Sequence, residues 1–312
     1  MNLDDPVIAV IGAGAVGGYY GARLAQHGHR VHLLMRSDAA AVRHSGLRID
    51  SRDGNFSLSP SQIHVHDDPR SLPQADLLLI ALKTTANDRL GELAGPAVKD
   101  DSAILTLQNG LGNEQRLAEL FGEQRVLGGM AFVCLNRVAP GHIVHSDHGK
   151  IRLGEYLGGP SQRARQIAAL FRGSSVPCDV VENLAYGRWE KLVWNIPFNG
   201  LGALLDLTTD RLVGNPDGLA LVTRLMQEAI DTAKALHLQL PDNLIQKEID
   251  YTRTMGGYRT STQIDRQKNR PLEVEAIWGE PLRTAQRNGI ATPALETLYL
   301  MLKMLPNCGQ YR

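Results

Sequence analysis

The sequence has no excess charge of either sign. Its 33 lysine and arginine residues are matched by 33 aspartate and glutamate residues, so the formal net charge is zero. A protein that binds duplex nucleic acid usually carries a basic excess, because its side chains neutralise phosphates. We therefore expect no nucleic acid among the partners of this chain.

Long hydrophobic runs are also missing. The longest unbroken aliphatic run covers residues 77–82, far short of the ~20 residues that a transmembrane helix needs. Residues 7–22 carry no charge, but Asp4 and Asp5 precede them where a signal peptide would be basic, and glycines interrupt them. We therefore expect no membrane partner and interpret this segment as internal structure.

Cysteine is scarce. Cys134, Cys178 and Cys308 are odd in number and follow neither a disulfide nor a metal-binding spacing. The histidine pairs His27/His29 and His64/His66 also lack the acids or cysteines that would complete a metal site. The sequence therefore predicts no metal and a reducing, cytoplasmic location.

The overall composition is that of a folded protein, with 43% hydrophobic and 21% charged residues. A chain of 312 residues exceeds what one hydrophobic core usually organises, so two domains are expected. In the first half, apolar runs of strand length alternate with helical patterns. The expected strands are Val7–Ile11 and residues 30–35, 76–82 and 104–107, and the first expected helix is Ala15–Gln26. This alternation predicts βαβ units and a parallel sheet.

The second half has a different pattern, with long helical periodicity from about residue 183. Residues 220–236 place apolar side chains at helical spacing. The predicted fold class is therefore α/β followed by all-α. We expect a Rossmann-type dinucleotide-binding domain over residues 1–182 and a helical substrate and catalytic domain over residues 183–312.

A glycine-rich turn follows the first expected strand and precedes the first expected helix. In this G-x-G-x-x-G motif, Gly12 permits a tight turn, Gly14 lets a pyrophosphate approach the backbone, and Gly17 lets the helix pack against the sheet. The helix N-terminus then offers N–H groups to phosphates. The predicted cofactor-binding residues of this turn are Gly12, Ala13, Gly14, Ala15, Val16 and Gly17.

The end of the second strand indicates which dinucleotide is bound. An NAD site usually has an acid there to bond the ribose 2′-hydroxyl, whereas this chain has Met35-Arg36-Ser37. Arg36 can form a bidentate contact with a 2′-phosphate, so we expect NADP. In the alternative, Arg36 is an ordinary surface cation and Asp38 bonds the ribose.

A polar row lies inside an apolar segment of the second half. Lys191, Asn195 and Asn199 stand at i, i+4 and i+8, so they share one face of a helix. The two amides can bind the oxygens of a keto acid while the ammonium polarises its carbonyl. A partnered polar stripe between domains would show the same spacing, and Pro197 is expected to kink the helix.

At this point the chain resembles a known family, the ketopantoate reductases (2-dehydropantoate 2-reductases). The glycine motif is generic, whereas the lysine with two asparagines and the serine-to-glutamate segment are specific. The matching segments are Gly12-x-Gly14-x-x-Gly17, Leu82-Lys83, Gln108-Asn109-Gly110-Leu111-Gly112, Lys191-Leu192-x-x-Asn195-x-x-x-Asn199, and Ser261 through Asp265 to Glu273.

The resemblance implies a role for each matched residue. Lys191 resembles the family's general acid, and Glu273 resembles the active-site glutamate that contacts cofactor or substrate and helps set the state of the lysine. Burial should lower the pKa of such a lysine, and a nearby glutamate should raise it. The resemblance further implies substrate contacts from Asn195 and Asn199.

Three more roles are implied by the resemblance. Ser261 is similar to the serine that binds the substrate carboxylate. Asn109 resembles a residue that contacts both cofactor and substrate, and Lys83 a lysine near the nicotinamide. Ordinary alternatives remain open: Ser261 as a turn or cap residue, Asn109-Gly110 as a simple turn, Lys83 as a surface cation, and Glu273 as an acid at the start of a helix near Pro271.

The resemblance predicts NADPH-dependent reduction of 2-dehydropantoate to (R)-pantoate, a step of pantothenate biosynthesis. Trp278 stands where the family commonly has an amide, so a reductase of another branched or aromatic 2-keto acid is an alternative. A non-catalytic NADP-binding sensor is an alternative of another class. The expected partner is a small anionic 2-keto acid, and a homodimer is possible from the long helices of the second half.

Overall fold

The computed structural model of this chain describes residues 5–306, and Cys308 lies outside them. The chain forms two compact units. The first unit comprises Met1–Gln108 and Asn113–Leu184, and the second comprises Asn109–Gly112 and Ala185–Arg312. The short segment Asn109–Gly112 therefore groups with residues that follow it by more than seventy positions in the chain.

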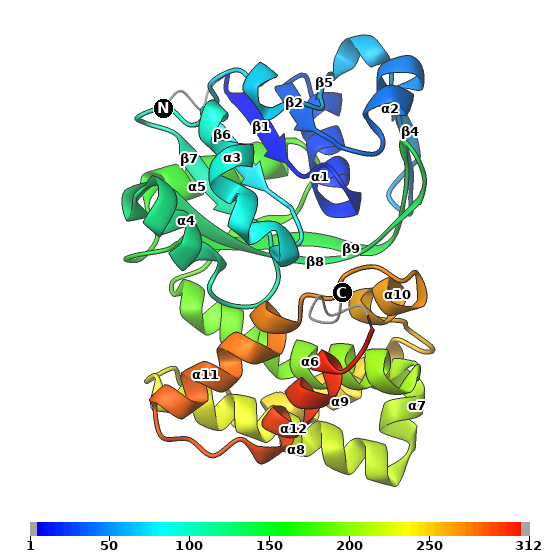
Figure 1. Cartoon of the computed structure of the whole chain (residues 1–312), viewed down its shortest axis with the longest axis vertical. Helices are drawn as coiled ribbons and strands as arrows, with labels where there is room; N and C mark the ends of the chain where they lie inside the picture. The colour runs from blue at the N-terminus through cyan, green and yellow to red at the C-terminus, as the bar shows by residue number, and fades with distance from the viewer. Residues whose placement is uncertain (1–4, 307–312) are drawn as a thin grey trace. The chain divides into compact units, whose positions relative to one another are not determined.

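The first unit is built on one sheet, ordered β4-β3-β9-β8-β7-β6-β1-β2-β5, with β10 paired to β9. The strands are β1 Val7–Ile11, β2 Arg30–Leu34, β3 Leu47–Ser51, β4 Phe56–Leu58, β5 His64–His66, β6 Leu77–Ile80, β7 Ala103–Thr106, β8 Val126–Ala139, β9 His142–Glu155 and β10 Cys178–Val180. From β5 to β8 every neighbouring pair is parallel. Figure 1 shows the helices against this sheet.

Both faces of the parallel region are covered, which explains its continuous apolar strands. Along β1, Ile8 and Val10 belong to one hydrophobic cluster, whereas Ala9 and Ile11 belong to another. Because successive side chains of a strand point to opposite faces, each cluster fills one side of the sheet. The helices of this unit are α1 Ala15–Gln26, α2 Ala39–Ser45, α3 Leu90–Ala94, α4 Asn113–Phe121 and α5 Gln162–Gly173, with short 3₁₀ turns at Pro60–Gln62, Pro69–Ser71, Thr84–Arg89, Gly95–Ala97 and Glu123–Arg125.

The sequence predicted a parallel sheet, and the observed sheet is mixed. β8 and β9, each of 14 residues, pair antiparallel and run side by side along their length (Figure 1). Gly141 lies between them with φ +67°, a backbone conformation that favours glycine. β4 is also antiparallel to β3. The hairpin lacks a clear alternation of apolar and polar residues, so its sequence gives a weak strand signal.

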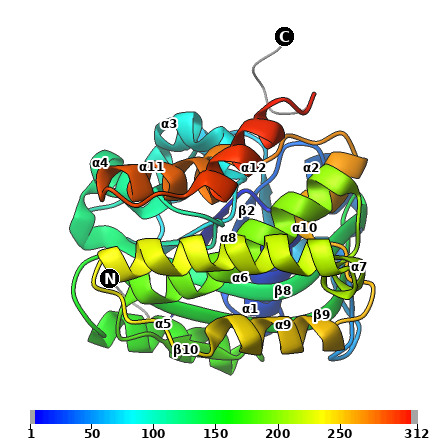
Figure 2. The same cartoon turned by 90° about the horizontal axis from the view of Figure 1, so that it is seen from below.

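The regular structure described in the second unit is helical. Its elements are α6 Leu184–Leu205, α7 Thr209–Gly214, α8 Pro216–Ala235, α9 Leu244–Thr254, α10 Ser261–Gln267, a π-helical turn Glu275–Gly279, α11 Glu280–Arg287 and α12 Pro293–Lys303. α8 lies beside α9 (Figure 2), and α8 coincides closely with the helix expected over residues 220–236. The predicted fold class, α/β followed by all-α, is confirmed. Among residues 5–306, no helix combines the length and hydropathy that crossing a membrane requires.

Candidate functional site

The glycine turn has the three features that its motif predicts. Gly12 has φ +93°, and a Cβ atom there would lie 2.7 Å from the backbone nitrogen of Leu82. A Cβ on Gly17 would lie 2.5 Å from the carbonyl oxygen of Gly12, so the close packing of α1 requires glycine. Around Gly14, by contrast, no atom of another described residue, apart from its chain neighbours and the backbone of α1, lies within 4 Å of the position a Cβ would take. The turn therefore leaves open space beside Gly14, where a phosphate can approach the backbone.

The N-terminus of α1 is suited to an anion. Gly14 is its N-cap residue, no side chain caps this end, and the first turn contains no acid. The first N–H groups of a helix have no partner within the helix and carry partial positive charge. Ala13, Ala15 and Val16 complete this turn. These residues can therefore hold the pyrophosphate of a dinucleotide.

The loop after β2 has one exposed cation and one buried acid. Arg36 is exposed and forms no ion pair within residues 5–306. The Asp38 carboxylate, whose side chain is 5% exposed, accepts a hydrogen bond from Arg137 Nη1 at 2.5 Å and one from Ser37 Oγ at 2.7 Å. Its other oxygen accepts from the backbone nitrogen of Gly141 at 3.3 Å. Asp38 is thus engaged by the protein itself.

Lys83 is half-buried and directly precedes the 3₁₀ turn Thr84–Arg89, beyond the end of β6. In that turn, Asn87 accepts a hydrogen bond from Gln108 Nε2 at 2.7 Å and donates one to Asn113 Oδ1 at 2.9 Å. The amide network links the chain segments that follow β6 and β7. It was not foreseen from the sequence, because its members lie 21 and 26 positions apart.

The second unit brings Lys191 and Asn109 together. Lys191 Nζ donates a hydrogen bond to Asn109 Oδ1 at 3.0 Å, although the two residues are 82 positions apart. Both Asn195 and Asn199 are buried, at 6% and 4% exposure. All three α6 residues stand on one face, because α6 is helical through Leu184–Leu205 with Pro197 inside it.

The charge environment of Lys191 is unusual for a lysine. Its pKa is lowered to about 7: burial lowers the pKa most, the positive charge of Arg188 also lowers it, and the negative charge of Glu273 opposes both effects. Arg188 is itself buried, at 4% exposure, and precedes Lys191 by three positions on α6. Sequence reasoning missed Arg188, although i, i+3 spacing places the two cations on neighbouring turns of one face.

Glu273 is half-buried and lies just before the helical segment that starts at Val274. The helix therefore begins three residues after Pro271, and Glu273 lies directly before its first residue, with its carbonyl oxygen accepting from the backbone nitrogen of Ile277, and not at the third helical position. The π-helical turn that follows contacts the Asn109 segment, because the Ala276 carbonyl oxygen accepts a hydrogen bond from Leu111 N at 2.9 Å. Single π-helical turns occur frequently at functional sites.

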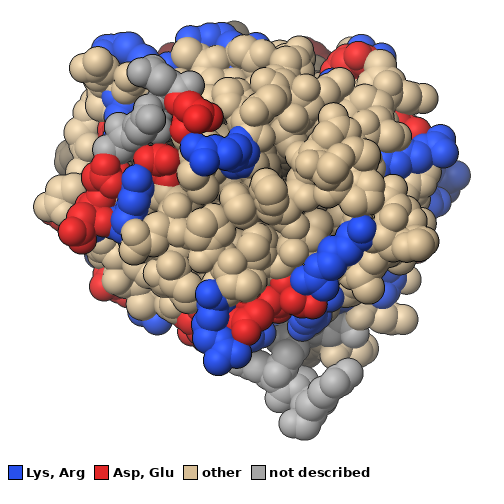
Figure 3. Space-filling model, turned by 90° about the horizontal axis from the view of Figure 1, so that it is seen from above, with Lys and Arg blue, Asp and Glu red and all other residues tan. Residues whose placement is uncertain are grey.

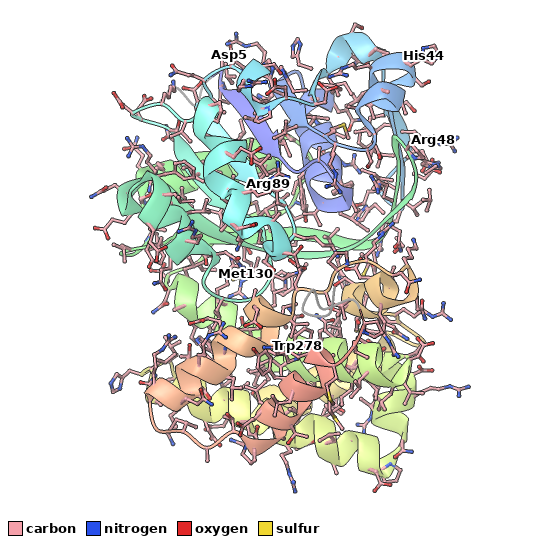
Figure 4. The ribbon with its side chains drawn as sticks, viewed as in Figure 1. Asp5, His44, Arg48, Arg89, Met130 and Trp278 are labelled. Carbon is pink, nitrogen blue, oxygen red and sulfur yellow. The ribbon has the colours of Figure 1, made fainter. Side chains whose placement is uncertain are left out.

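Trp278 lies in the same π-helical turn and is fully buried, at 0% exposure. Figure 4 shows it among the helices of the second unit. Its indole Nε1 donates a hydrogen bond to the Ile196 carbonyl oxygen at 2.9 Å. It therefore belongs to the hydrophobic core of this unit.

Ser261 is the first residue of α10 and is exposed. The cap of this helix is the preceding residue, since the Thr260 side chain accepts from the backbone nitrogen of Gln263. The alternative that made Ser261 the cap is therefore wrong. Within residues 5–306, no three histidine, cysteine, aspartate or glutamate side chains are grouped to hold a metal ion.

Comparison with known proteins gives matches over most of the chain. The family model described as "Ketopantoate reductase PanE/ApbA" matches residues 8–158, and the one described as "Ketopantoate reductase PanE/ApbA C terminal" matches residues 183–306. A 2-dehydropantoate 2-reductase of Nostoc sp. is 44% identical over 308 residues, covering 97% of this chain and 96% of the relative.

Two crystal structures of proteins with the same name are also similar. The structure from Geobacter metallireducens GS-15 has a TM-score of 0.92 at 44% identity. The match covers 95% of this chain and 98% of the Geobacter chain. The structure from Methylococcus capsulatus has a TM-score of 0.87 at 36% identity and covers 96% of both chains.

Proposed function

This chain belongs to the ketopantoate reductase family, as its motifs predicted, and we propose that it reduces 2-dehydropantoate to (R)-pantoate with NADPH, in pantothenate biosynthesis. The expected enzyme class, an oxidoreductase of this family, is confirmed. One observation carries the proposal. A lysine with a pKa of about 7 donates a hydrogen bond to Asn109, on a helix face that also bears two buried asparagines.

NADP is the proposed cofactor, bound by residues 1–182. The glycine turn accommodates a pyrophosphate because the space beside Gly14 is open. Arg36 supplies an exposed guanidinium for a 2′-phosphate. The alternative in which Asp38 bonds the ribose hydroxyls is disfavoured, because its carboxylate is buried and accepts hydrogen bonds from Ser37, Arg137 and Gly141. In the same proposal Lys83, Asn109 and Glu273 also contact the cofactor.

Residues 183–312, with Asn109, are proposed to bind the substrate and supply the proton. When bound, NADPH supplies the hydride for the ketone carbon. The oxygen then needs a proton, and a protonated Lys191 Nζ can donate one because its pKa of about 7 makes the ammonium a competent acid near neutral pH. Asn109 orients that nitrogen, and the charge of Glu273 favours its protonated form.

The remaining polar groups are proposed to bind the keto acid. Asn195 and Asn199 present amide donors to its oxygens, and the exposed Ser261 hydroxyl is proposed for its carboxylate. A reductase of another branched or aromatic 2-keto acid remains the second candidate. The observation that motivated it, Trp278, gives it little support, because a fully buried indole does not offer a surface to a substrate.

A panel of 2-keto acids with NADPH consumption as the readout tests the proposal. We expect 2-dehydropantoate to have the highest kcat/KM of the panel. A much higher kcat/KM for another keto acid would favour the second candidate. Tight NADPH binding with no oxidation by any keto acid would favour a non-catalytic NADP sensor.

The proposed partner is a small anionic 2-keto acid, with no nucleic acid or membrane, and a homodimer is a possible assembly. On the face shown in Figure 3, the described basic and acidic side chains are interspersed. Cys134 and Cys178 are both buried. The proposed location is cytoplasmic.

A further inference from the structure

The long hairpin of the first unit carries a second guanidinium to the loop after β2. Arg137, near the end of β8, forms an ion pair with Asp38 at 2.5 Å. The same nitrogen, Nη1, donates to Ser37 Oγ at 2.9 Å. Ser37 directly follows Arg36, so two arginines that are 101 positions apart in the chain meet at one short loop.

The Asp38 carboxylate fixes the position of Arg137. An ion pair with a carboxylate that is only 5% exposed is screened less than a surface pair. The Gly141 backbone nitrogen donates to the other Asp38 oxygen at 3.3 Å, so the turn of the hairpin is held by the same side chain. The guanidinium is thereby oriented before any ligand arrives.

Arg137 retains donors that the protein does not use. A guanidinium has five N–H donors in a rigid fork. Within residues 5–306, the hydrogen bonds of Arg137 are made by Nη1, and Nε and Nη2 have no partner. Its side chain is 31% exposed. Arg36, in the loop that Arg137 reaches, is exposed and forms no ion pair within residues 5–306. Two arginines against one aspartate leave a net positive charge at this loop.

We propose that Arg137 is a second determinant of cofactor specificity, which with Arg36 recognises the 2′-phosphate of NADP. This inference rests on the proposed use of NADP. The phosphate is a dianion with several acceptor oxygens, and paired guanidinium groups match its charge and geometry. NADH has a hydroxyl at that position, so it gains little from Arg137.

Binding titrations of three variants test this role without measuring turnover. The variants are R137A, R137K and the control R48A, and the ligands are NADPH, NADH and 2′,5′-ADP. Arg48 is a suitable control because it also pairs with an aspartate of the first unit, Asp50 at 2.9 Å, and its side chain points outward (Figure 4). R137K retains the positive charge but lacks the planar set of guanidinium donors. Its binding data therefore remain informative if R137A folds poorly.

We expect R137A to bind NADPH and 2′,5′-ADP about tenfold more weakly, the loss of one charge-assisted contact, and NADH within about twofold of the parent. R137K should bind NADPH with an affinity between those of R137A and the parent. R48A should bind all three ligands as the parent does. An equal loss of NADPH and NADH affinity, or no loss of either, would overturn the role. If the parent chain bound NADH as tightly as NADPH, the NADP assignment itself would fail, and the role of Arg137 with it.

Discussion

The indole Nε1 of Trp278 donates a hydrogen bond of 2.9 Å to the main-chain carbonyl of Ile196. Ile196 lies in α6 between Asn195 and Asn199, and Trp278 lies in the π-helical turn that begins two residues after Glu273. A Cβ on Gly200 would lie 2.9 Å from the same indole nitrogen, so the approach requires glycine there. The buried side chain of Trp278 therefore connects α6, which bears Asn195 and Asn199, to the segment that follows Glu273.

Replacing Trp278 by phenylalanine tests this connection. W278F retains most of the ring but removes the donor, so we expect the free energy of unfolding to fall by about 1 kcal/mol from the hydrogen bond alone. We also expect KM for the keto acid to rise several-fold while the dissociation constant of NADPH stays unchanged. W189F is the matched control. Trp189 is a buried tryptophan of α6, and its indole forms no hydrogen bond within residues 5–306. An unchanged KM in a destabilised W278F would restrict Trp278 to a packing role.

Lys191 provides the most direct test of the proposed proton transfer. We expect K191A to lower kcat by about 10²–10⁴-fold, the usual contribution of a general acid. The K234A control changes an exposed lysine of α8 in the same unit and should leave kcat unaltered. A K191A enzyme with nearly parental turnover on its best keto acid would refute the assigned role.

The charges around Lys191 predict a pH dependence with a defined sign. An acid catalyst must be protonated, so kcat/KM should be constant below pH 7 and fall as pH rises above the lysine pKa of about 7. Removing the like charge in R188Q should raise that pKa and move the falling limb to higher pH. Removing the opposite charge in E273Q should move the limb to lower pH. Shifts in the same direction for both variants would contradict this electrostatic account.

Gly110 should be intolerant of any side chain. Its φ is +81°, and a Cβ there would lie 2.2 Å from the carbonyl oxygen of Ala276. The conformation alone should destabilise G110A by about 1–3 kcal/mol. The displaced loop should also weaken the contact between Asn109 and Lys191 and lower kcat. G214A is the control, because among the described residues a Cβ at Gly214 would have no atom within 4 Å beyond its chain neighbours and its own helix backbone. Equal thermal stability and turnover of the two variants would show that the close approach at Gly110 is unimportant.

A histidine cluster predicts a loss of stability in mild acid. His32 Nδ1 lies 3.0 Å from His66 Nε2, and the His32 ring stacks on that of His64. Burial, the two histidines and Arg30 lower the pKa of His32 to about 4 from an ordinary value of 6.5. The unfolded chain therefore takes up the proton first, and the free energy of unfolding should fall as pH drops from about 6.5 towards 4.

Urea titrations at several pH values measure this effect. H32N should reduce the loss of stability over that pH range, whereas H44N should not, because His44 is an exposed histidine of the same unit (Figure 4). If H32N showed the same pH dependence as the parent, another group would be responsible.

Local sequence was sufficient for much of the fold. β1 and α1 have the bounds predicted from their patterns, because a buried parallel strand and an amphipathic helix each carry a clear periodic signal. The β8–β9 hairpin was missed because its partly buried faces lack that signal. The helix that could begin at Pro271 begins three residues later, at Val274, and continues as a π-helical turn, a tertiary feature with no simple spacing rule.

For the site, residue order alone specified the spacing of Lys191, Asn195 and Asn199, since a helix converts that spacing into one face. It left the environment of each group open. The tertiary structure decided that Asn109 accepts a hydrogen bond from Lys191 and that Arg137 forms an ion pair with Asp38. It also decided that Trp278 is buried against α6. These pairs lie 82 to 99 positions apart in the chain. Burial and charge act through space, so the pKa of Lys191 and the engagement of Asp38 depend on neighbours that only the folded chain supplies.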